Sequence, residues 1–282
     1  MVNFFPLLFI LLWSSAFISG KIITLDATPF AGLSFRFAIV IFGFLIYAYF
    51  KKEKILVSIK NFFESFLTGV LFHGIYLGGC WYAFSVGVPA AIVALIVTLQ
   101  PILTNIFSGP LFNEKISWKQ WVGVILGFFG SIIVLGIDFN NEYPLLGILT
   151  CLAALAGITI GTLWQKKLSG NIPLSVNNAY QALGGCLFNL LLMTLFENPS
   201  IHFTTSFILA ISHQIFFISF GAFAILMYLI KNRSVSKTST LFFLVPPVSA
   251  VMAFVFINET LTKFDILGLV IASIGVYVAT RK

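Results

Sequence analysis

The sequence predicts an all-α polytopic membrane protein with ten transmembrane helices, arranged as two inverted five-helix repeats. The first observation is composition: hydrophobic residues make up 59% of the chain and charged residues only 9%, whereas a soluble domain carries about 25% charged residues. So few charges cannot cover a water-facing surface, which indicates a lipid bilayer. A spanning helix needs about 20 apolar residues, so 282 residues accommodate ten spans joined by short loops.

The second observation is an internal repeat. Pro101 precedes Pro246 by 246 − 101 = 145 positions. The same offset relates further pairs: Asn113-Glu114 with Asn258-Glu259, Gly123 with Gly268, and Gly130 with Gly275. A constant offset over several anchors indicates one unit used twice. We therefore predict a first repeat over residues 1–140 and a second, inverted repeat over 141–282.

The third observation is where the basic residues lie. With the N-terminus in the cytoplasm, 13 Lys and Arg fall in inner loops or at the C-terminus, and only Lys21 and Lys263 fall outside. This bias satisfies the positive-inside rule and explains the net charge of +7 without nucleic acid as a partner. Five spans per half place Lys21 outside and its repeat mate Lys166 inside, so the halves cross the membrane in opposite senses. We predict a bacterial inner-membrane protein with both termini cytoplasmic.

Ten apolar segments can be marked in order along the chain. They are 4–23, 29–50, 62–84, 87–110, 119–137, 143–163, 174–196, 207–230, 235–257 and 264–280. The connections between them are short and polar, and several carry Asp, Asn, Gly or Pro, which favour turns and helix ends. The first segment lacks a basic leader and a small-residue cleavage site, so we expect a retained helix rather than a signal peptide.

Several of these residues carry a resemblance to a known family. They include Trp13 to Phe17, Arg36-Phe37, Trp81 to Ala83, Pro101 with Asn113-Glu114, and Pro246 with Asn258-Glu259. Their order and spacing resemble the drug/metabolite transporter superfamily, in particular the EamA-type exporters, which include bacterial exporters of aromatic amino acids and metabolites. The resemblance implies a ten-helix fold and export of small metabolites, and it leaves the substrate open.

Prolines lie near the middle of two predicted spans. Pro101 is in the segment 87–110, and Pro246-Pro247 is in the segment 235–257. Proline removes a backbone hydrogen bond and kinks a helix, and the freed carbonyl groups need other partners in a bilayer. The symmetric placement favours bent helices that line a midplane cavity. The alternative is a packing kink without a ligand.

Polar and aromatic residues within the spans are candidates for substrate contact. His73, Tyr76 and Cys80 share one helical face, and a polar face inside a membrane tends to line a polar interior. Arg36 offers either a fixed positive charge near the outer mouth or a side chain that snorkels to the headgroups. The predicted substrate-binding residues are Trp13, Arg36, His73, Tyr76, Trp81, Gln100, Trp164, Asn178 and Gln181.

Some of these predictions have an equally structural alternative. Trp13 and Trp81 could stack on an aromatic or cationic substrate, whereas Trp164 also fits an interfacial aromatic belt. Asn178 and Gln181 could face the cavity or hold helices together through hydrogen bonds. Small-xxx-small pairs such as Gly123 and Gly127 favour close helix packing, within one chain or in a homodimer.

No nucleotide-binding loop and no hydrolase or metalloprotease motif is present in the sequence. We therefore expect no catalytic activity, no cofactor and no bound metal, but a secondary active or facilitative transporter. The alternatives are an exporter of drugs or lipid-like amphiphiles, a passive channel and, more remotely, an integral-membrane enzyme. The candidate cavity residues include no acid, which favours neutral, zwitterionic or anionic substrates, with amino acids the leading class. If protons drive transport, the sequence favours His73 as the coupling residue.

Overall fold

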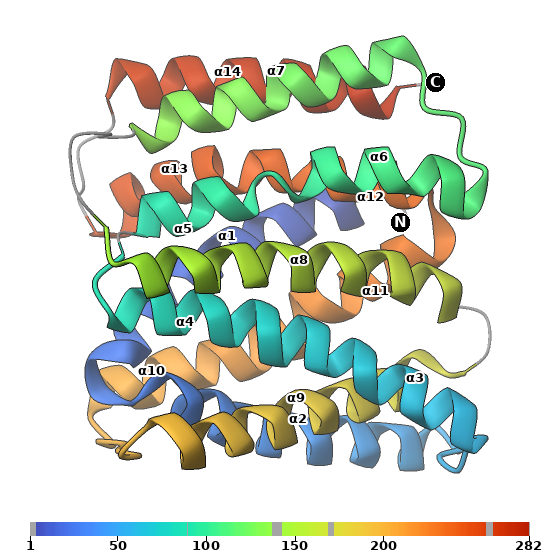
Figure 1. The fold of residues 1–282 in the computed structure, drawn as a ribbon, viewed down its shortest axis with the longest axis vertical. Helices are drawn as coiled ribbons and strands as arrows, with labels where there is room; N and C mark the ends of the chain where they lie inside the picture. Colours follow the sequence, from blue (N-terminus) through green and yellow to red (C-terminus); the bar gives the residue numbers. More distant parts are fainter. Residues whose placement is uncertain (1–3, 89, 137–142, 169–171, 258–261, 282) are drawn as a thin grey trace.

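The computed structural model describes residues 4–88, 90–136, 143–168, 172–257 and 262–281. These residues form ten helical rods (Figure 1). Rod 1 is α1 (Phe5–Asp26), and rod 2 is α2 (Pro29–Phe50). Rod 3 consists of α3 (Ile59–Gly69), η1 (Val70–Tyr76) and α4 (Leu77–Ser85). Rod 4 consists of α5 (Ala90–Val97) and α6 (Gln100–Phe112), and rod 5 is α7 (Trp118–Leu135). Rod 6 is α8 (Leu145–Leu168), and rod 7 is α9 (Leu174–Phe196). Rod 8 consists of α10 (Thr205–His213), η2 (Gln214–Phe223) and α11 (Ala224–Asn232). Rod 9 consists of α12 (Val235–Thr240), η3 (Leu241–Leu244) and α13 (Val245–Ile257), and rod 10 is α14 (Lys263–Thr280).

Nine helical stretches of the described chain are long and apolar enough to cross a membrane. The remaining rod, rod 3, falls outside that set and carries His73, Tyr76 and several glycines among its apolar residues. The all-α, multi-pass fold class predicted from the sequence is thus confirmed. The predicted boundary between the halves at residue 140 lies outside the described residues and stays a prediction.

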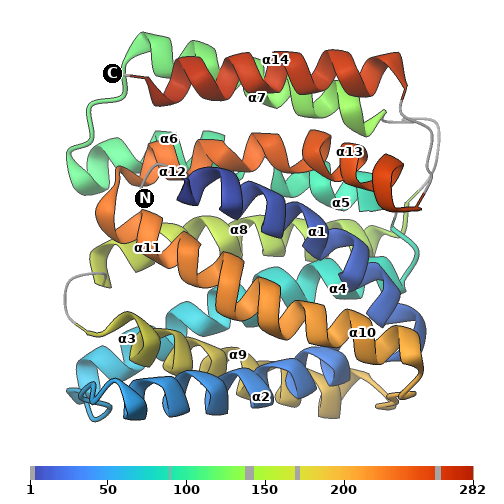
Figure 2. The ribbon, with the colours of Figure 1, turned by 180° about the vertical axis from the view of Figure 1, so that it is seen from behind.

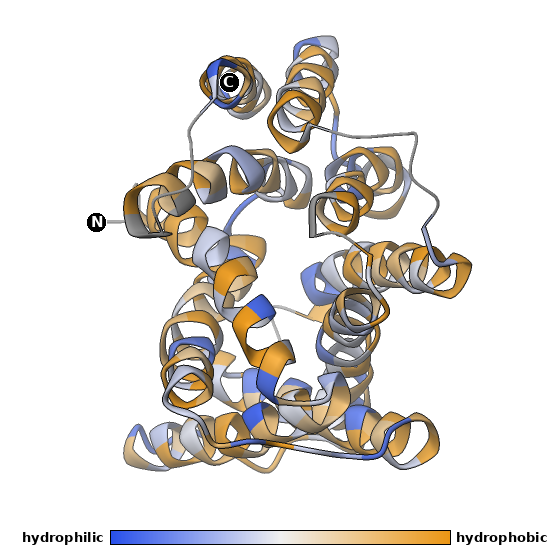
Figure 3. Cartoon of the chain, turned by 90° about the vertical axis from the view of Figure 1, so that its left-hand side faces the viewer, coloured by the Kyte–Doolittle hydropathy of each residue, from blue (hydrophilic) through white to orange (hydrophobic). Residues whose placement is uncertain are grey.

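Burial is arranged as expected for a protein surrounded by lipid. Large apolar side chains are exposed on the outside, including Leu25 at 78% and Phe50 at 77%. Polar side chains lie inside, including Arg36 at 2% exposure and Gln181 at 0%. In the end-on view of Figure 3 the ribbon is hydrophobic over most of its length, and hydrophilic residues occur within the bundle.

Helices α7 and α14 form one end of the bundle, and α2 and α9 form the other (Figures 1 and 2). Glycines allow α7 and α14 to touch through their backbones. A Cβ atom on Gly123 would lie 2.4 Å from the Ala279 amide nitrogen, and one on Gly130 would lie 2.4 Å from the Ala272 amide nitrogen. The later glycine on α7, Gly130, contacts the earlier residue on α14, Ala272, so the two helices are antiparallel. We refer to this contact as the glycine seam.

Carboxylates tie the opposite pair, α2 and α9, at both ends. Glu197 follows α9 and accepts hydrogen bonds from the amides of Phe30 and Ala31, at 2.9 and 3.2 Å, in the first turn of α2. Glu53 follows α2 and accepts a hydrogen bond from the hydroxyl of Ser175, in the first turn of α9. A helix N-terminus favours negative charge, and each of the two helices has a carboxylate at its N-terminus that follows the C-terminus of the other. The two helices are therefore antiparallel.

The prolines coincide with interruptions in rods 4 and 9. Rod 4 breaks between α5 and α6, and Pro101 lies in the first turn of α6. In rod 9, Pro247 leaves the carbonyl of Phe243 without a donor from its own helix. The hydroxyl of Ser131, on α7, lies 3.0 Å from that carbonyl and donates to it.

Candidate functional site

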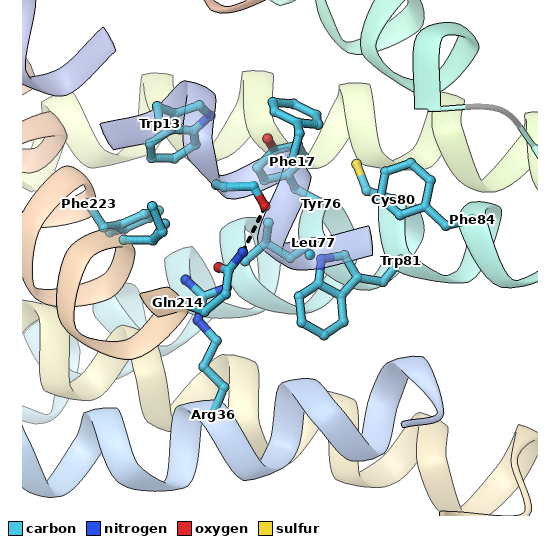
Figure 4. Close-up of a pocket in the computed structure, with 13 residues that line it drawn as sticks. Trp13, Phe17, Arg36, Tyr76, Leu77, Cys80, Trp81, Phe84, Gln214 and Phe223 are labelled. Atoms are coloured by element: carbon cyan, nitrogen blue, oxygen red, sulfur yellow. Dashed lines mark hydrogen bonds between the residues drawn. The ribbon is translucent and has the colours of Figure 1, made fainter. Parts of the chain in front are cut away.

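A small cavity lies among α1, α2, rod 3 and rod 8, and we name it the central cavity (Figure 4). Its volume is about 40 Å³, enough for a few water molecules. Its walls are formed by Trp13, Ala16, Phe17, Gly20, Arg36, Tyr76, Leu77, Cys80, Trp81, Phe84, Gln214, Ile218 and Phe223. The structure therefore brings four of the predicted substrate-binding residues together here: Trp13, Arg36, Tyr76 and Trp81.

Arg36 supplies the positive charge of the central cavity. Its side chain rises from α2 into the cavity (Figure 4) and is only 2% exposed. The Nε atom donates a hydrogen bond to the hydroxyl of Ser219 at 3.1 Å, and the guanidinium carbon lies 5.0 Å from the centre of the Phe37 ring. Among the described residues, no carboxylate lies near enough to neutralise this charge. A buried charge without a counter-ion is costly, so the cavity favours an anionic group.

Aromatic rings form most of the remaining wall. The rings of Trp13 and Phe223 are stacked, with their centroids 5.8 Å apart. Trp81 lies on the other side of the cavity in Figure 4, where its indole nitrogen approaches Gly20 closely enough that an added Cβ would lie 3.4 Å away. Such rings favour flat or apolar groups and can also stack on a cation.

Gln214 is a cavity residue that was not among those predicted from the sequence. Its Nε2 atom donates hydrogen bonds to the Ala16 carbonyl at 2.8 Å and to the Ser19 hydroxyl at 2.9 Å. Its Oε1 atom is buried and has no hydrogen-bond partner among the described residues. The cavity therefore offers one free acceptor beside the arginine. The sequence feature that could have indicated Gln214 is that it is an isolated amide side chain within the apolar segment 207–230.

Two π-helical segments place residues around this cavity. Segment η1 contains Tyr76, and segment η2 begins at Gln214 and ends at Phe223. Adding the repeat offset to the bounds of η1 gives 70 + 145 = 215 and 76 + 145 = 221, both within η2. A π-helical turn is rare and is frequently found at functional sites. The two halves thus contribute the same local distortion to one cavity.

His73 lies one turn before Tyr76 but does not line the cavity. Its ring packs between Phe37 and Phe223, with centroid distances of 4.3 and 4.5 Å. The Nδ1 atom is buried without a hydrogen-bond partner among the described residues. His73 therefore lies behind the cavity wall, in an aromatic environment.

The other four predicted substrate-binding residues lie away from the central cavity. Gln100 donates hydrogen bonds to the hydroxyls of Thr104 and Thr162, joining α6 to α8. Gln181 donates to the Oε1 atom of Gln165 at 2.6 Å, joining α9 to α8. The ring of Trp164 lies 5.3 Å from the Nζ atom of Lys167. Asn178 faces a separate depression, bounded by α2, α9 and η2.

The described residues contain no group of three or more His, Cys, Asp or Glu side chains that could hold a metal ion. The central cavity instead combines one cation, one free amide oxygen and several aromatic rings. This combination can bind a small molecule that carries an anionic group, a hydrogen-bond donor and an apolar part.

Comparison with known proteins gives a consistent family match. The model of the EamA-like transporter family matches this chain twice, over residues 1–136 and 145–281. The chain is 27% identical to an uncharacterized transporter, YvbV, of Bacillus subtilis over 221 residues, which are 78% of this chain and 70% of that protein. It is 24% identical to a probable amino-acid metabolite efflux pump of Salmonella typhimurium, covering 98% of this chain and 93% of that protein.

A solved crystal structure shares the fold. Its TM-score to this chain is 0.85 with 20% sequence identity, over 99% of this chain and 96% of the solved one. A probable amino-acid metabolite efflux pump of Escherichia coli is 22% identical, over 96% of this chain and 92% of that protein.

Proposed function

This chain belongs to the EamA-like transporter family, and we propose that it exports small organic metabolites, with amino acids as the substrate class, across a bacterial inner membrane. It is a multi-pass membrane protein of a transporter family. The names of its relatives in Salmonella and Escherichia support an amino-acid substrate. The 13-to-2 bias of Lys and Arg supports cytoplasmic termini.

The observation that carries the substrate class is the unpaired Arg36 in the central cavity. A guanidinium group binds a carboxylate through two parallel N–H donors, and its Nε atom is already engaged with Ser219 at 3.1 Å. The free Oε1 atom of Gln214 can accept a hydrogen bond from a substrate ammonium group. Trp13, Trp81 and Phe223 then suit an apolar side chain. An α-amino acid with an apolar or aromatic side chain meets all three requirements.

The architecture supports alternating access. We propose that residues 1–140 and 141–282 are inverted repeats that rock around the central cavity, as such repeats do in other secondary transporters. The cavity volume of about 40 Å³ is too small for an amino acid. Substrate therefore enters in a conformation in which α1, α2, rod 3 and rod 8 lie further apart.

Counterflow in proteoliposomes tests the proposal, with L-phenylalanine as the probe. Phenylalanine amide and phenethylamine have the same ring and ammonium group but no carboxylate. We expect wild type to exchange phenylalanine at least about tenfold faster than either analogue, because a guanidinium–carboxylate pair in a desolvated site is worth more than about 1.4 kcal/mol. Arg36→Gln should remove this preference.

Lys21→Gln is the matched control, because it removes one positive charge from the exposed side of α1 without reaching the cavity. Equal exchange of all three probes by wild type, or an undiminished preference in Arg36→Gln, would contradict the role of Arg36. Recovery of the solute in chemically intact form separates a transporter from an enzyme.

An exporter of amphiphiles is the second candidate, and one observation favours it. A depression between α1 and α10 opens on the apolar surface of the bundle and is lined largely by apolar side chains. Export of a lipid-like amphiphile such as a long-chain quaternary amine, with no exchange of phenylalanine, would replace the amino-acid proposal.

A further inference from the structure

The depression between α1 and α10 contains a histidine with an unusual hydrogen-bond environment. We name this depression the α1–α10 groove, and its polar residues are Ser15, Ser19, Asp26, Ser206 and His213. The groove follows α1 from Leu11 to Asp26, the last residue of that helix. It therefore connects His213, within the membrane span, to the membrane face at which α1 ends.

Both ring nitrogens of His213 have a hydroxyl partner on α1. The Nε2 atom lies 3.1 Å from Ser15 Oγ, and the Nδ1 atom lies 3.0 Å from Ser19 Oγ. Each hydroxyl also has a backbone carbonyl to which it can donate. Ser15 Oγ lies 2.7 Å from the Leu12 oxygen, and Ser19 Oγ lies 3.3 Å from the Ala16 oxygen.

These distances fit a histidine that donates from both nitrogens. A neutral imidazole has one donor and one acceptor, so one serine would have to donate to the ring and give up its carbonyl partner. The doubly protonated ring donates to both serines, and both serines keep their carbonyl partners. The protonated form thus keeps all four of these hydrogen bonds at once, whereas the neutral form keeps three of them.

The same network reaches Arg36 in the central cavity. Gln214 follows His213 in the chain, and its Nε2 atom donates a hydrogen bond to Ser19 Oγ at 2.9 Å. The Gln214 carbonyl accepts from Ser219 Oγ at 3.1 Å, and Ser219 Oγ accepts from Arg36 Nε at 3.1 Å. Two serines and one glutamine therefore separate the histidine from the arginine.

Charge couples the two positions. Arg36 lies near enough for its charge to act on His213, and two positive charges repel each other. A carboxylate on Arg36 removes most of that repulsion, so binding of the carboxylate and protonation of His213 favour each other. Linkage makes the effect reciprocal. The other titratable group that lines the groove among the described residues is Asp26, whose carboxylate accepts a hydrogen bond from the Thr204 hydroxyl at 2.7 Å. From α13 the groove is lined by Met252.

We propose that His213 is a proton-binding site that regulates this transporter, in that a proton there strengthens the binding of a carboxylate substrate at Arg36. The proton comes from water at the membrane face through the α1–α10 groove. The substrate part of this inference rests on the proposed function. His73, which the sequence favoured for coupling, lacks these features because its ring packs between Phe37 and Phe223 and its Nδ1 atom has no described partner.

The first test needs no ligand. Histidine labelled with ¹⁵N in nanodiscs reports the protonation of each ring nitrogen, and His213→Gln and His73→Gln assign the signals. Between about pH 8 and pH 5, the range in which histidine ordinarily titrates, we expect the His213 signal to change from one protonated nitrogen to two. A His213 ring that stays neutral over this range overturns the proposal, whatever the substrate is.

The second test measures the dissociation constant of L-phenylalanine at about pH 5.5 and pH 8. We expect binding to be about tenfold tighter at the lower pH, within the usual range of coupling between sites. His213→Gln should make the two constants equal, whereas His73→Gln should keep their ratio. A ratio that persists in His213→Gln, or disappears in His73→Gln, overturns the coupling. Absence of phenylalanine binding at either pH contradicts the proposed function, and the nitrogen titration then decides the proton site alone.

Discussion

In the glycine seam, the backbones of α7 and α14 approach so closely that an added Cβ on Gly123 would lie 2.4 Å from a backbone nitrogen. In the central cavity, by contrast, the guanidinium group of Arg36 has no described carboxylate partner and the Oε1 atom of Gln214 has no donor. The seam leaves no room for an added atom, whereas the cavity has polar groups that are free to bind a ligand. Tight packing therefore holds the bundle together at one end, while the unsatisfied groups near its centre lower stability and remain available to a ligand.

The largest effect that sharpens this comparison is expected in the seam. Gly123→Ala should destabilise the protein by about 3 kcal/mol, because the new methyl group meets backbone atoms of α14 that cannot move independently. Thermal or chemical unfolding in detergent measures it. Gly109→Ala in α6 is the control: its added Cβ would lie 3.6 Å from the nearest atom, so it should be neutral or slightly stabilising. Equal losses in both variants would show that the seam is not special.

The cavity should respond in the opposite direction. Arg36→Met should stabilise the protein by about 2 kcal/mol, because it replaces a buried charge lacking a counter-ion with an apolar side chain. The same variant should lose phenylalanine exchange. Lys21→Met, on the exposed side of α1, should change stability by less than about 0.5 kcal/mol. A destabilised Arg36→Met protein would mean that Arg36 holds the fold together, and the contrast with the seam would fail.

Ser131, on the seam helix α7, forms a hydrogen bond to the proline-containing rod 9, and removing its hydroxyl tests what this contact contributes to stability. Ser131→Ala leaves the Phe243 carbonyl, freed by Pro247, without the donor that lies 3.0 Å away. We expect a loss of about 1.5 kcal/mol, the usual penalty for an unsatisfied buried polar group. The hydroxyl of Ser85 is exposed and bonds only within its own helix, so Ser85→Ala should cost much less. Equal unfolding midpoints for the two variants would argue against this role.

Glu114 gives the smallest expected effect and a pH signature outside both regions. Its carboxylate accepts hydrogen bonds from the Val235 and Ser236 amides at 2.9 and 3.2 Å, at the start of α12. Partial burial acts to raise the pKa of Glu114, but bonds from Ser236, Ser234 and these amides outweigh it and lower the pKa below its ordinary value.

A lowered pKa in the folded state means that the carboxylate stabilises the protein above its unfolded pKa. This contribution disappears as the pH falls through the folded value. Glu114→Gln should therefore be about 1 kcal/mol less stable than wild type near neutral pH, and the two should converge in acid. A stability difference that is independent of pH would contradict the capping role of the carboxylate.

The fold was largely predictable because its signals are local or periodic. The repeat offset, apolar segments and basic loops need no knowledge of packing, and the predicted segment 29–50 coincides with α2 (Pro29–Phe50). Segment ends were less accurate where capping decides them. The predicted segment 62–84 became Ile59–Ser85 because Ser58 caps the helix through the amide of Asn61.

The candidate site was only partly predictable, because polarity within a membrane span has two explanations. The 145-residue offset relates Arg36 to Gln181, yet Arg36 faces the cavity and Gln181 donates a hydrogen bond to Gln165 on a neighbouring helix. Whether a polar side chain faces the cavity or bonds to a neighbouring helix depends on the rotation of its helix about the helix axis. That rotation is set by contacts between residues distant in the sequence. Gln214 was missed for the same reason. Whether the residues gathered in the cavity bind substrate remains the prediction that the phenylalanine experiments address.

The matching positions of η1 and η2 bear on the history of the chain. A π-helical turn holds one residue more than the α-helical turn it replaces, so it marks an insertion into an α-helix. Since η1 falls within η2 after the 145-residue offset, a single insertion in one copy of the predicted five-helix repeat, made before that copy was duplicated, would account for both. An ancestor with five helices would already have carried the distortion, and two such subunits meeting in opposite orientations would have enclosed a symmetric version of the cavity.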